Sequence, residues 1–248
     1  MKIRRILVSQ PEPQSEKSPY LELAQKHNVK IDFRPFIHVE GVSTKEFRQQ
    51  RVDILAHTAV IFTSKTAIDN YFRICEETRV TVPETMKYFC ITETIALYLQ
   101  KYIVYRKRKI FFGTNTFPEL MDVILKHKEE KFLVPLSDPH KPEIPKTLDK
   151  AKIKYTKVIL YKTVSSDLSD VKLKEDYDMV VFYSPTGVKS LFDNFKEFDQ
   201  GDMKVGTFGP TTAKAAKDAG IRLDVNAPTP TCPSMTQALD EFLKKNNK

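Results

Sequence analysis

The chain has 248 residues, of which 41% are hydrophobic and 29% are charged, and its formal net charge is +8. This composition is ordinary for a globular protein of one large or two smaller domains, and the apolar runs are too short to span a bilayer. The positive charge favours an anionic partner, such as a polycarboxylate, a phosphate compound or nucleic acid.

Short apolar runs alternate with segments of helical periodicity along the whole chain. That alternation predicts parallel sheets flanked by helices. The basic N-terminal run is expected to hold a first strand and not a signal peptide, because its apolar part ends after Val8. Ten strands are predicted, over residues 5–9, 31–39, 59–63, 87–91, 109–112, 131–135, 156–163, 178–183, 204–208 and 221–225.

The two halves of the chain resemble each other, which predicts a duplicated domain with a period on the order of 120 residues. The pattern leaves open whether each domain is built from neighbouring units or from crossed ones. Strands 31–39 and 156–163 are long enough to cross between domains as a connecting ribbon. Three pairs of segments align: residues 61–72 with 181–192, 91–99 with 208–216, and 114–120 with 229–235.

Two serines in matched positions each follow a strand and precede an apolar helical stripe. These are Ser64 and Ser184, and Pro185 suits the first position of the second helix. One interpretation is that both serines only cap their helices. The other is that the free N–H groups at these helix starts also bind a ligand carboxylate, favoured by the helix dipole.

A second kind of helix start is Gly209-Pro210-Thr211-Thr212. Gly209 permits a tight turn from strand to helix, and the two threonines offer amides and hydroxyls near the carboxyl end of a strand. Open α/β sheets bind their ligands at that edge. Thr116 with Glu119 predicts a capping box, and residues 229–233 predict one more helix start. The repeated set indicates an anion-binding site more strongly than any one member.

Several kinds of chemistry lack support in this sequence. There is no GxGxxG, P-loop or GxSxG motif, and the five histidines show no metal-ligand spacing. His140 is predicted to be a loop residue, and the basic run at 105–109 a solvated loop or strand edge. The three cysteines form no CxxC and fit a reducing cytoplasm. The absence of a nucleic-acid-binding motif makes nucleic acid the less favoured anion.

Five segments together resemble the uroporphyrinogen-III synthase family over nearly the whole chain: VFYSPTGVKSLF, GTFGPTTAKAAKDAGI, APTPTCPSMTQAL, ILVSQPEPQ and VILYKT. The resemblance implies an α/β fold of two similar domains with parallel sheets flanked by helices, joined by a two-stranded β ribbon, with a cleft between the domains. A discontinuous domain would comprise residues 1–36 and 165–248, and an inserted domain residues 37–164. The first half departs from the family pattern at Gln10, where arginine is common, and at CITETIA, which replaces a glycine-containing turn.

The resemblance also implies a reaction. The family closes hydroxymethylbilane, a linear tetrapyrrole with eight carboxylates, into uroporphyrinogen III, with loss of water and inversion of the last pyrrole ring. This is a lyase reaction of heme biosynthesis that needs no cofactor and no metal. Positioning alone can supply roughly 7–11 kcal/mol of such a barrier.

Tyr161, in Tyr161-Lys162-Thr163, matches the family's tyrosine and is the expected catalytic residue, a mild acid that helps the hydroxyl leave. A tyrosine phenol has an ordinary pKa of about 10 and is protonated at neutral pH. The alternative is that this tyrosine only packs its ring. The expected substrate-binding residues are Ser64, Thr94, Ser184, Gly187, Gly209, Thr211 and Thr212.

Two functions of other classes stay open at this point. One is a two-domain protein that binds a tetrapyrrole or another polyanion without catalysis, and the other is a basic nucleic-acid-binding protein. For the synthase we expect a cytoplasmic monomer whose partner is its small-molecule substrate, with neither nucleic acid nor a membrane as a partner.

Overall fold

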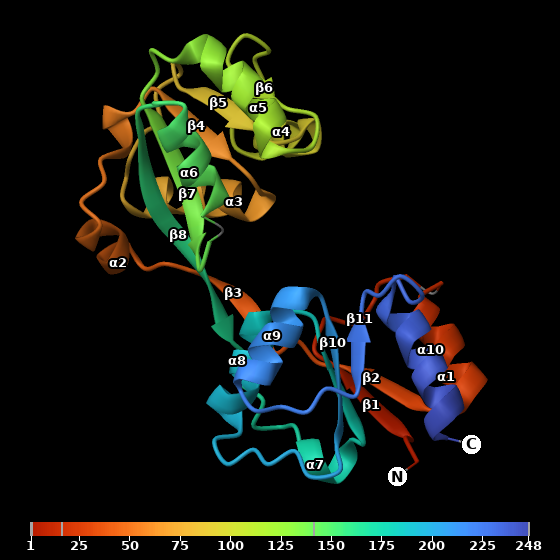
Figure 1. The fold of residues 1–248 in the computed structure, drawn as a ribbon. Helices are drawn as coiled ribbons and strands as arrows, with labels where there is room; N and C mark the ends of the chain where they lie inside the picture. The colour runs from red at the N-terminus through yellow and green to blue at the C-terminus, as the bar shows by residue number, and fades with distance from the viewer. Residues whose placement is uncertain (1, 16, 141, 248) are drawn as a thin grey trace. The chain divides into compact units, whose positions relative to one another are not determined.

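The computed structural model describes residues 2–15, 17–140 and 142–247, and the chain divides into two compact units (Figure 1). The discontinuous unit comprises residues 1–38 and 164–248, and the inserted unit comprises residues 39–163. Each unit is a largely parallel sheet with helices on both faces, so the expected α/β class is confirmed. The sequence predicted one domain of residues 1–36 and 165–248 and another of residues 37–164, and these domain boundaries stay a prediction.

The discontinuous unit contains a five-stranded sheet in the order β11-β10-β9-β1-β2, and all its pairings are parallel. Its strands are β1 (Arg5–Val8), β2 (Lys30–Phe33), β9 (Met179–Phe182), β10 (Lys204–Phe208) and β11 (Val225–Ala227). Its helices are α1 (Pro19–His27), α7 (Leu173–Asp176), α8 (Pro185–Asn194), α9 (Pro210–Asp218) and α10 (Met235–Asn246).

Alternating side chains of β1 explain why this sheet is covered on both faces. Ile6 and Val8 belong to the core under α1 and α10, whereas Leu7 belongs to the core under α8 and α9. Successive side chains of a strand point to opposite faces, so a strand buried on both sides needs a continuous apolar run. The RILV sequence of β1 supplies that run.

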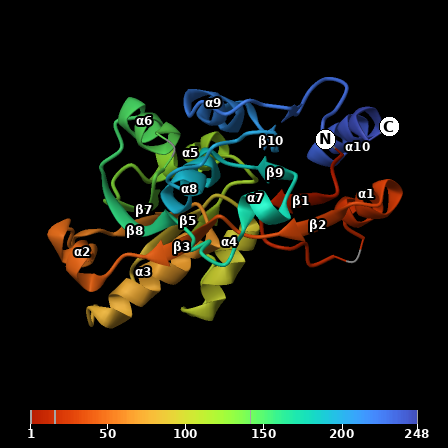
Figure 2. The ribbon, with the colours of Figure 1, turned by 90° about the horizontal axis from the view of Figure 1, so that it is seen from below.

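The inserted unit contains a six-stranded sheet in the order β3-β8-β7-β4-β5-β6. Its strands are β3 (Ile37–Gly41), β4 (Ala59–Phe62), β5 (Lys87–Cys90), β6 (Ile110–Phe112), β7 (Phe132–Asp138) and β8 (Tyr155–Ser165). The helices α2 (Thr44–Gln49), α3 (Lys65–Glu77) and α4 (Glu93–Tyr98) cover one face, and α5 (Phe117–Ile124) and α6 (Glu143–Lys150) cover the other (Figure 2). Short 3₁₀ turns, Ile54–Ala56, Leu99–Lys101 and Leu125–His127, follow or precede these elements.

The apolar stripe predicted for the helix after Ser64 is confirmed in α3. Ile68, Tyr71 and Cys75 are buried in the core against β4, and Phe72 packs at its edge. These positions recur at helical spacing and so lie on one face. Replacing the fully buried Ile68 by alanine would cost about 2–5 kcal/mol of stability.

The predicted strand 31–39 is wrong as a single element. The structure has β2 and β3 instead, separated by Arg34, Pro35 and Phe36. Pro35 has no N–H for a ladder, and Phe36 leaves the strand to become fully buried. The Phe36 carbonyl accepts hydrogen bonds from the Ser166 N–H and the Ser190 hydroxyl, and these fix the break.

Two further predictions near the C-terminus are shifted. The strand expected at 221–225 is β11, which begins at Val225; Ile221 is buried against α9 instead. The helix start expected at 229–233 is a turn, in which the Cys232 N–H donates to Thr229 Oγ1 over 3.0 Å. The helix α10 begins later, where Ser234 caps it.

The strands β3 and β8 are neighbours at one edge of the six-stranded sheet, and both cross a boundary between the two units. The connecting ribbon and the cleft that the resemblance implies stay predictions. Within the described residues, no helix combines the length and the apolar character that crossing a membrane requires.

Candidate functional site

A pocket of about 600 Å³ lies in the inserted unit, where β4, β5 and β7 end and α5 and α6 begin. Leu136 and Ile91 contribute to its apolar part. Because β4, β5 and β7 are parallel, the residues after them meet at one edge of the sheet, which is the edge where such sheets bind ligands. Its polar lining is formed by Thr63, Thr116, Ser137, His140, Glu143 and Tyr161.

Tyr161 lines this pocket and is hydrogen-bonded to Ser64. The Tyr161 hydroxyl lies 3.2 Å from Ser64 Oγ, within hydrogen-bond distance, although the residues are 97 positions apart. Ser64 Oγ also accepts the Ala67 N–H over 3.0 Å, so Ser64 is the N-cap of α3 as expected. The Tyr161 side chain is largely buried, at 9% exposure, and its ring packs in the core under α3.

The start of α4 is capped by Thr92, a role that was not expected from the sequence. Thr92 Oγ1 accepts the Ile95 N–H over 3.3 Å. Thr94, the residue expected to bind substrate, is the second residue of α4 and is exposed, as Thr211 is in α9. The two threonines therefore occupy equivalent places, and their contact with a ligand stays a prediction.

Glu119 closes the start of α5 as the capping-box prediction requires. Its carboxylate accepts the N–H groups of Thr116 and Asn115 over 2.8 and 2.9 Å. Hydrogen bonds from the Thr114 side chain and the Thr116 backbone lower the pKa of Glu119 to about 2. The N–H groups of Asn115 and Thr116 therefore already have an acceptor. The start of α5 contributes Thr116 as its polar residue to the pocket wall.

The start of α8 in the discontinuous unit has the same design as that of α3. Ser184 Oγ accepts the Gly187 N–H over 3.0 Å. A Cβ at Gly187 would lie 3.3 Å from Ser184 Oγ and 3.7 Å from Ser9 Oγ, so the glycine permits a close approach of this turn to the end of β1. Ser9 is buried beside this turn and was not among the site residues expected from the sequence.

The turn before α9 depends on a glycine. Gly209 has φ 93° and ψ 144°, a backbone conformation that is essentially restricted to glycine. Its N–H donates to the Ala227 carbonyl over 2.6 Å and joins this turn to β11. Thr212 is buried at 1% exposure, whereas Thr211 is exposed. Of the two adjacent hydroxyls, only that of Thr211 faces solvent.

Aromatic side chains stand beside these turns. The ring of Tyr183 lies 5.4 Å from that of Phe208, and the Tyr183 hydroxyl is hydrogen-bonded to that of Tyr20. Burial raises the pKa of both tyrosines, so their hydroxyls stay protonated at neutral pH. Tyr183 directly precedes Ser184, and Phe208 directly precedes Gly209, so apolar rings flank both helix starts.

The predicted residues are divided between the two units. Ser64, Thr94 and Tyr161 lie in the inserted unit, and the others lie in the discontinuous unit: Ser184, Gly187, Gly209, Thr211 and Thr212. Ser64 and Thr94 follow the carboxyl ends of β4 and β5, and Ser184 and Gly209 follow those of β9 and β10. Tyr161 lies within β8, opposite Ser137 near the end of β7. His140, expected to be an ordinary loop residue, lines the pocket together with Tyr161. The sequence predicted that His140 follows a strand, but it did not predict that His140 and Tyr161 line one pocket, because that depends on the pairing of β7 with β8.

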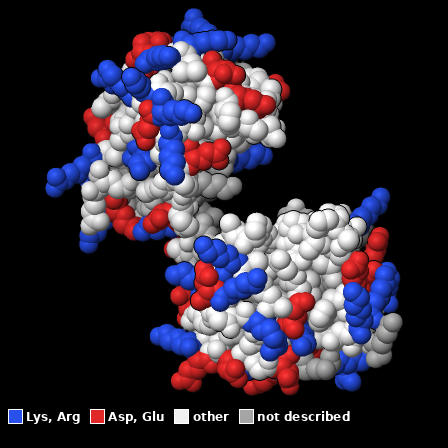
Figure 3. Space-filling view, viewed as in Figure 1, with Lys and Arg blue, Asp and Glu red and all other residues white. Residues whose placement is uncertain are grey.

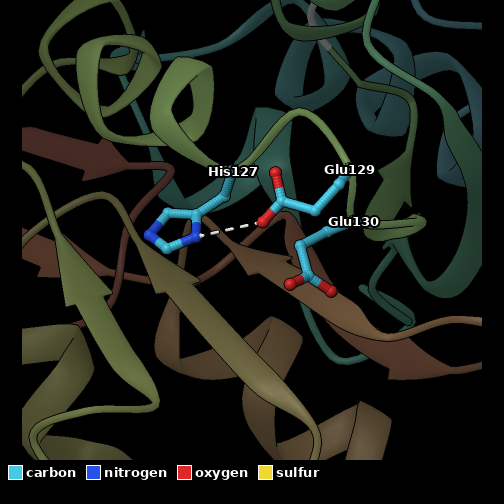
Figure 4. Close-up of side chains that lie close together, drawn as sticks. All are labelled: His127, Glu129 and Glu130. Atoms are coloured by element: carbon cyan, nitrogen blue, oxygen red, sulfur yellow. Dashed lines mark ion pairs between the residues drawn. The ribbon is translucent and has the colours of Figure 1, made fainter.

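One cluster of metal-ligand residue types lies elsewhere, near the amino ends of the strands (Figure 4). His127 Nδ1 lies 3.7 Å from Glu129, and the Glu130 carboxylate lies 2.5 Å from Lys87 Nζ, at the start of β5. Burial opposes ionisation of Glu130, but hydrogen bonds from the Lys87 and Thr58 side chains and the nearby positive charges together outweigh burial and lower the pKa of Glu130. Since a cation would have to displace Lys87, the cluster is better explained as an ion pair.

Charges of both signs are intermixed on the visible face of each unit (Figure 3). The basic run at 105–109 forms the turn before β6, as predicted, and Arg106 pairs with Glu84 over 2.8 Å. On this face the basic side chains do not form the continuous stripe that is typical of nucleic-acid-binding proteins.

The fold and the site define a class of protein. It is an α/β protein of two units, whose parallel sheets carry hydroxyl-bearing helix starts at their carboxyl edges and, in the inserted unit, a pocket with a tyrosine. The family model described as uroporphyrinogen-III synthase HemD matches residues 18–237, so the chain belongs to the uroporphyrinogen-III synthase family. The resemblance noted in the sequence is thereby confirmed.

Individual relatives agree with this family. Uroporphyrinogen-III synthase of Schizosaccharomyces pombe (strain 972 / ATCC 24843) is 27% identical over 127 residues, which cover 49% of this chain and 47% of that protein. The match therefore spans less than half the length of the yeast protein.

Two solved structures share the fold. The uroporphyrinogen-III synthetase of Helicobacter pylori 26695 is 16% identical, with a TM-score of 0.58, and the match covers 98% of this chain and 100% of that one. A mutant uroporphyrinogen III synthase of the extremely thermophilic bacterium Thermus thermophilus is also 16% identical, with a TM-score of 0.50 and coverage of 98% and 99%. At this low sequence identity, the two matches show only that the fold is shared.

Proposed function

We propose that this protein is a uroporphyrinogen-III synthase, a lyase that closes hydroxymethylbilane into uroporphyrinogen III with loss of water and inversion of the last pyrrole ring, in heme biosynthesis. The observation that carries the proposal is the hydrogen-bonded pair of Tyr161 and Ser64 at the pocket of the inserted unit, in a chain of this family.

Tyr161 supplies the acid in this proposal. Ser64 Oγ accepts the Ala67 N–H and can donate its own proton to the Tyr161 oxygen. The phenol O–H is then free to donate to the hydroxymethyl oxygen of a substrate in the pocket. A positioned general acid contributes about 10²- to 10⁴-fold to a rate.

The helix starts hold the substrate's carboxylates in this proposal. Backbone N–H groups and the positive end of the helix dipole stabilise anions there, and the net charge of +8 favours a polyanionic ligand in general. Holding the chain of four pyrroles in a fixed curve lets the substituted carbon of the last ring react first. No nucleophile is required, because orientation lowers the barrier.

The finer points belong to the same proposal. We expect the protein to work in the cytoplasm, because Cys75, Cys90 and Cys232 are buried as free thiols, which suits a reducing compartment. We also expect a monomer, because two domains of one chain would already supply the cleft that the family resemblance implies. We expect no cofactor and no metal, and neither nucleic acid nor a membrane as a partner.

Product analysis tests the proposal. The purified protein is incubated with hydroxymethylbilane, the products are oxidised to porphyrins, and the isomers are separated. Uroporphyrinogen III in excess over the protein-free control supports the synthase. If only the uninverted isomer forms while the bilane is bound, the protein is a binding protein without catalysis, and the proposal fails.

A further inference from the structure

His140 is held in a defined orientation at the pocket of the inserted unit. Its ring Nδ1 lies 3.1 Å from the carbonyl oxygen of Ser137, which lies near the end of β7, just before the loop that carries His140. The same loop is tightened by the Ser137 hydroxyl, which donates to the Pro139 carbonyl over 2.8 Å. The side chain is half-buried and forms part of the pocket wall.

This contact determines which nitrogen of the ring can accept a proton. A carbonyl oxygen only accepts hydrogen bonds, so Nδ1 must carry the proton and donate it to Ser137. In the neutral ring Nε2 then has a free lone pair, and it makes no hydrogen bond to any residue that the structure describes. An imidazole anchored through one nitrogen with the other unoccupied is suited to proton transfer.

Few other groups at the pocket can exchange protons with this ring. Tyr161 on β8 and Glu143 at the start of α6 are the ionisable residues of the described wall besides His140. The wall residues from α5 and from the ends of β4 and β5 are uncharged. Asp138, the last residue of β7, is a charged residue that precedes the loop of His140. In the proposed function Tyr161 is the acid, and the reaction also needs a base that accepts a proton.

We propose that Nε2 of His140 accepts the proton that the last pyrrole ring loses when the macrocycle closes. This rests on the proposed function. The bond between the methylene carbon and the hydroxyl oxygen breaks, and the oxygen leaves as water with a proton from Tyr161. The methylene carbon bonds to the substituted carbon of the last ring, and the bond from that ring carbon to the neighbouring methylene bridge breaks. The released bridge carbon then bonds to the carbon of the same ring that still bears hydrogen, and that carbon loses its proton to Nε2.

The step balances without a further reactant. The electron pair of the broken C–H bond returns to the ring and restores its aromaticity. The imidazolium then returns the proton to the Tyr161 phenolate, directly or through water, so that both side chains regain their starting forms. The net change is the loss of one water molecule, as the proposed reaction requires.

The test is His140→Gln, assayed for formation of uroporphyrinogen III between about pH 5.5 and 9. We expect kcat to fall about 100-fold at neutral to alkaline pH while KM changes by less than about threefold. The wild-type kcat should fall about tenfold per pH unit on the acid side, because a protonated imidazole cannot accept a proton, and the variant should lack this limb. A kcat within about twofold of wild type, or a retained acid limb, overturns the proposal.

A matched control and a second variant separate chemistry from structure. His57 Nδ1 also lies close to a backbone carbonyl, 2.8 Å from the Asp53 oxygen, but it precedes β4 and is not part of the pocket wall. His57→Gln should leave kcat unchanged. In His140→Ala, added imidazole should restore part of the lost rate, and a failure of rescue in a folded variant contradicts a role in proton transfer.

The two proposals fail in different ways. If the wild type forms no uroporphyrinogen III above background, the proposed function falls, and the role of His140 falls with it. If wild type and His140→Gln form it equally fast, only the role of His140 is refuted.

Discussion

Replacing Tyr161 by phenylalanine removes one oxygen atom and keeps the ring that packs under α3. The hydroxyl is buried with its residue at 9% exposure, and Ser64 Oγ lies 3.2 Å away. Loss of one such hydrogen bond costs about 0.5–1.5 kcal/mol, so the variant should remain folded. Loss of a general acid should lower kcat about 100-fold, which corresponds to about 2.7 kcal/mol of transition-state stabilisation.

The assay is the rate of uroporphyrinogen III formation, with thermal unfolding measured in parallel. Tyr155→Phe is the matched control, because Tyr155 lies on the same strand and its hydroxyl donates to Asp149 over 2.9 Å, away from the pocket. Both variants should lose about the same stability, within about 1 kcal/mol, but only Tyr161→Phe should lose turnover. An unchanged kcat in Tyr161→Phe would remove the phenol from the mechanism, and an equal loss in both variants would make the effect structural.

Three further outcomes are expected. Ser184→Ala and Ser234→Ala each remove an N-cap and should lower the unfolding free energy by about 1 kcal/mol in denaturant. Only Ser184→Ala should raise KM for the bilane, and equal KM values in the two variants would mean that Ser184 is a cap alone. Gly209→Ala should destabilise by about 1–3 kcal/mol because of its φ of 93°, and an unshifted Tm would contradict the strain argument. Hydrogen bonding from Lys162 lowers the pKa of Glu46 from 4.5 to about 2. The stabilising effect of ionised Glu46 is therefore complete above pH 4.5 and is lost as pH falls toward 2. Glu46→Gln should flatten the dependence of the unfolding free energy on pH in that window, and an unaltered dependence would argue against this contribution.

The sequence predicted those features that depend on local chemistry. Serines that follow an apolar run, such as Ser64 and Ser184, cap helices because the orphan N–H groups of a helix start need an acceptor nearby in the chain. Gly209 was expected at a tight turn for the same local reason, and it has a positive φ. Parallel sheets followed from the alternation of strands and helices.

Features that depend on long-range packing were not predictable in the same way. The contact of Tyr161 with Ser64 follows from the order β8-β7-β4 in the sheet, which no local pattern contains. Phe36 interrupts the predicted strand because the core buries it and distant residues bind its carbonyl. Thr211 and Thr212 look equivalent in the sequence, but only the direction of α9 on its sheet decides which hydroxyl is buried.

The most direct test of the central claim, that the carboxyl edges of the sheets bind the tetrapyrrole, is an amide NMR titration of the protein with uroporphyrinogen III. The account predicts the largest shifts at the helix starts after Ser64, Ser184 and Gly209. Shifts confined to the opposite edge of the inserted unit's sheet, around Lys87 and Glu130, would contradict it.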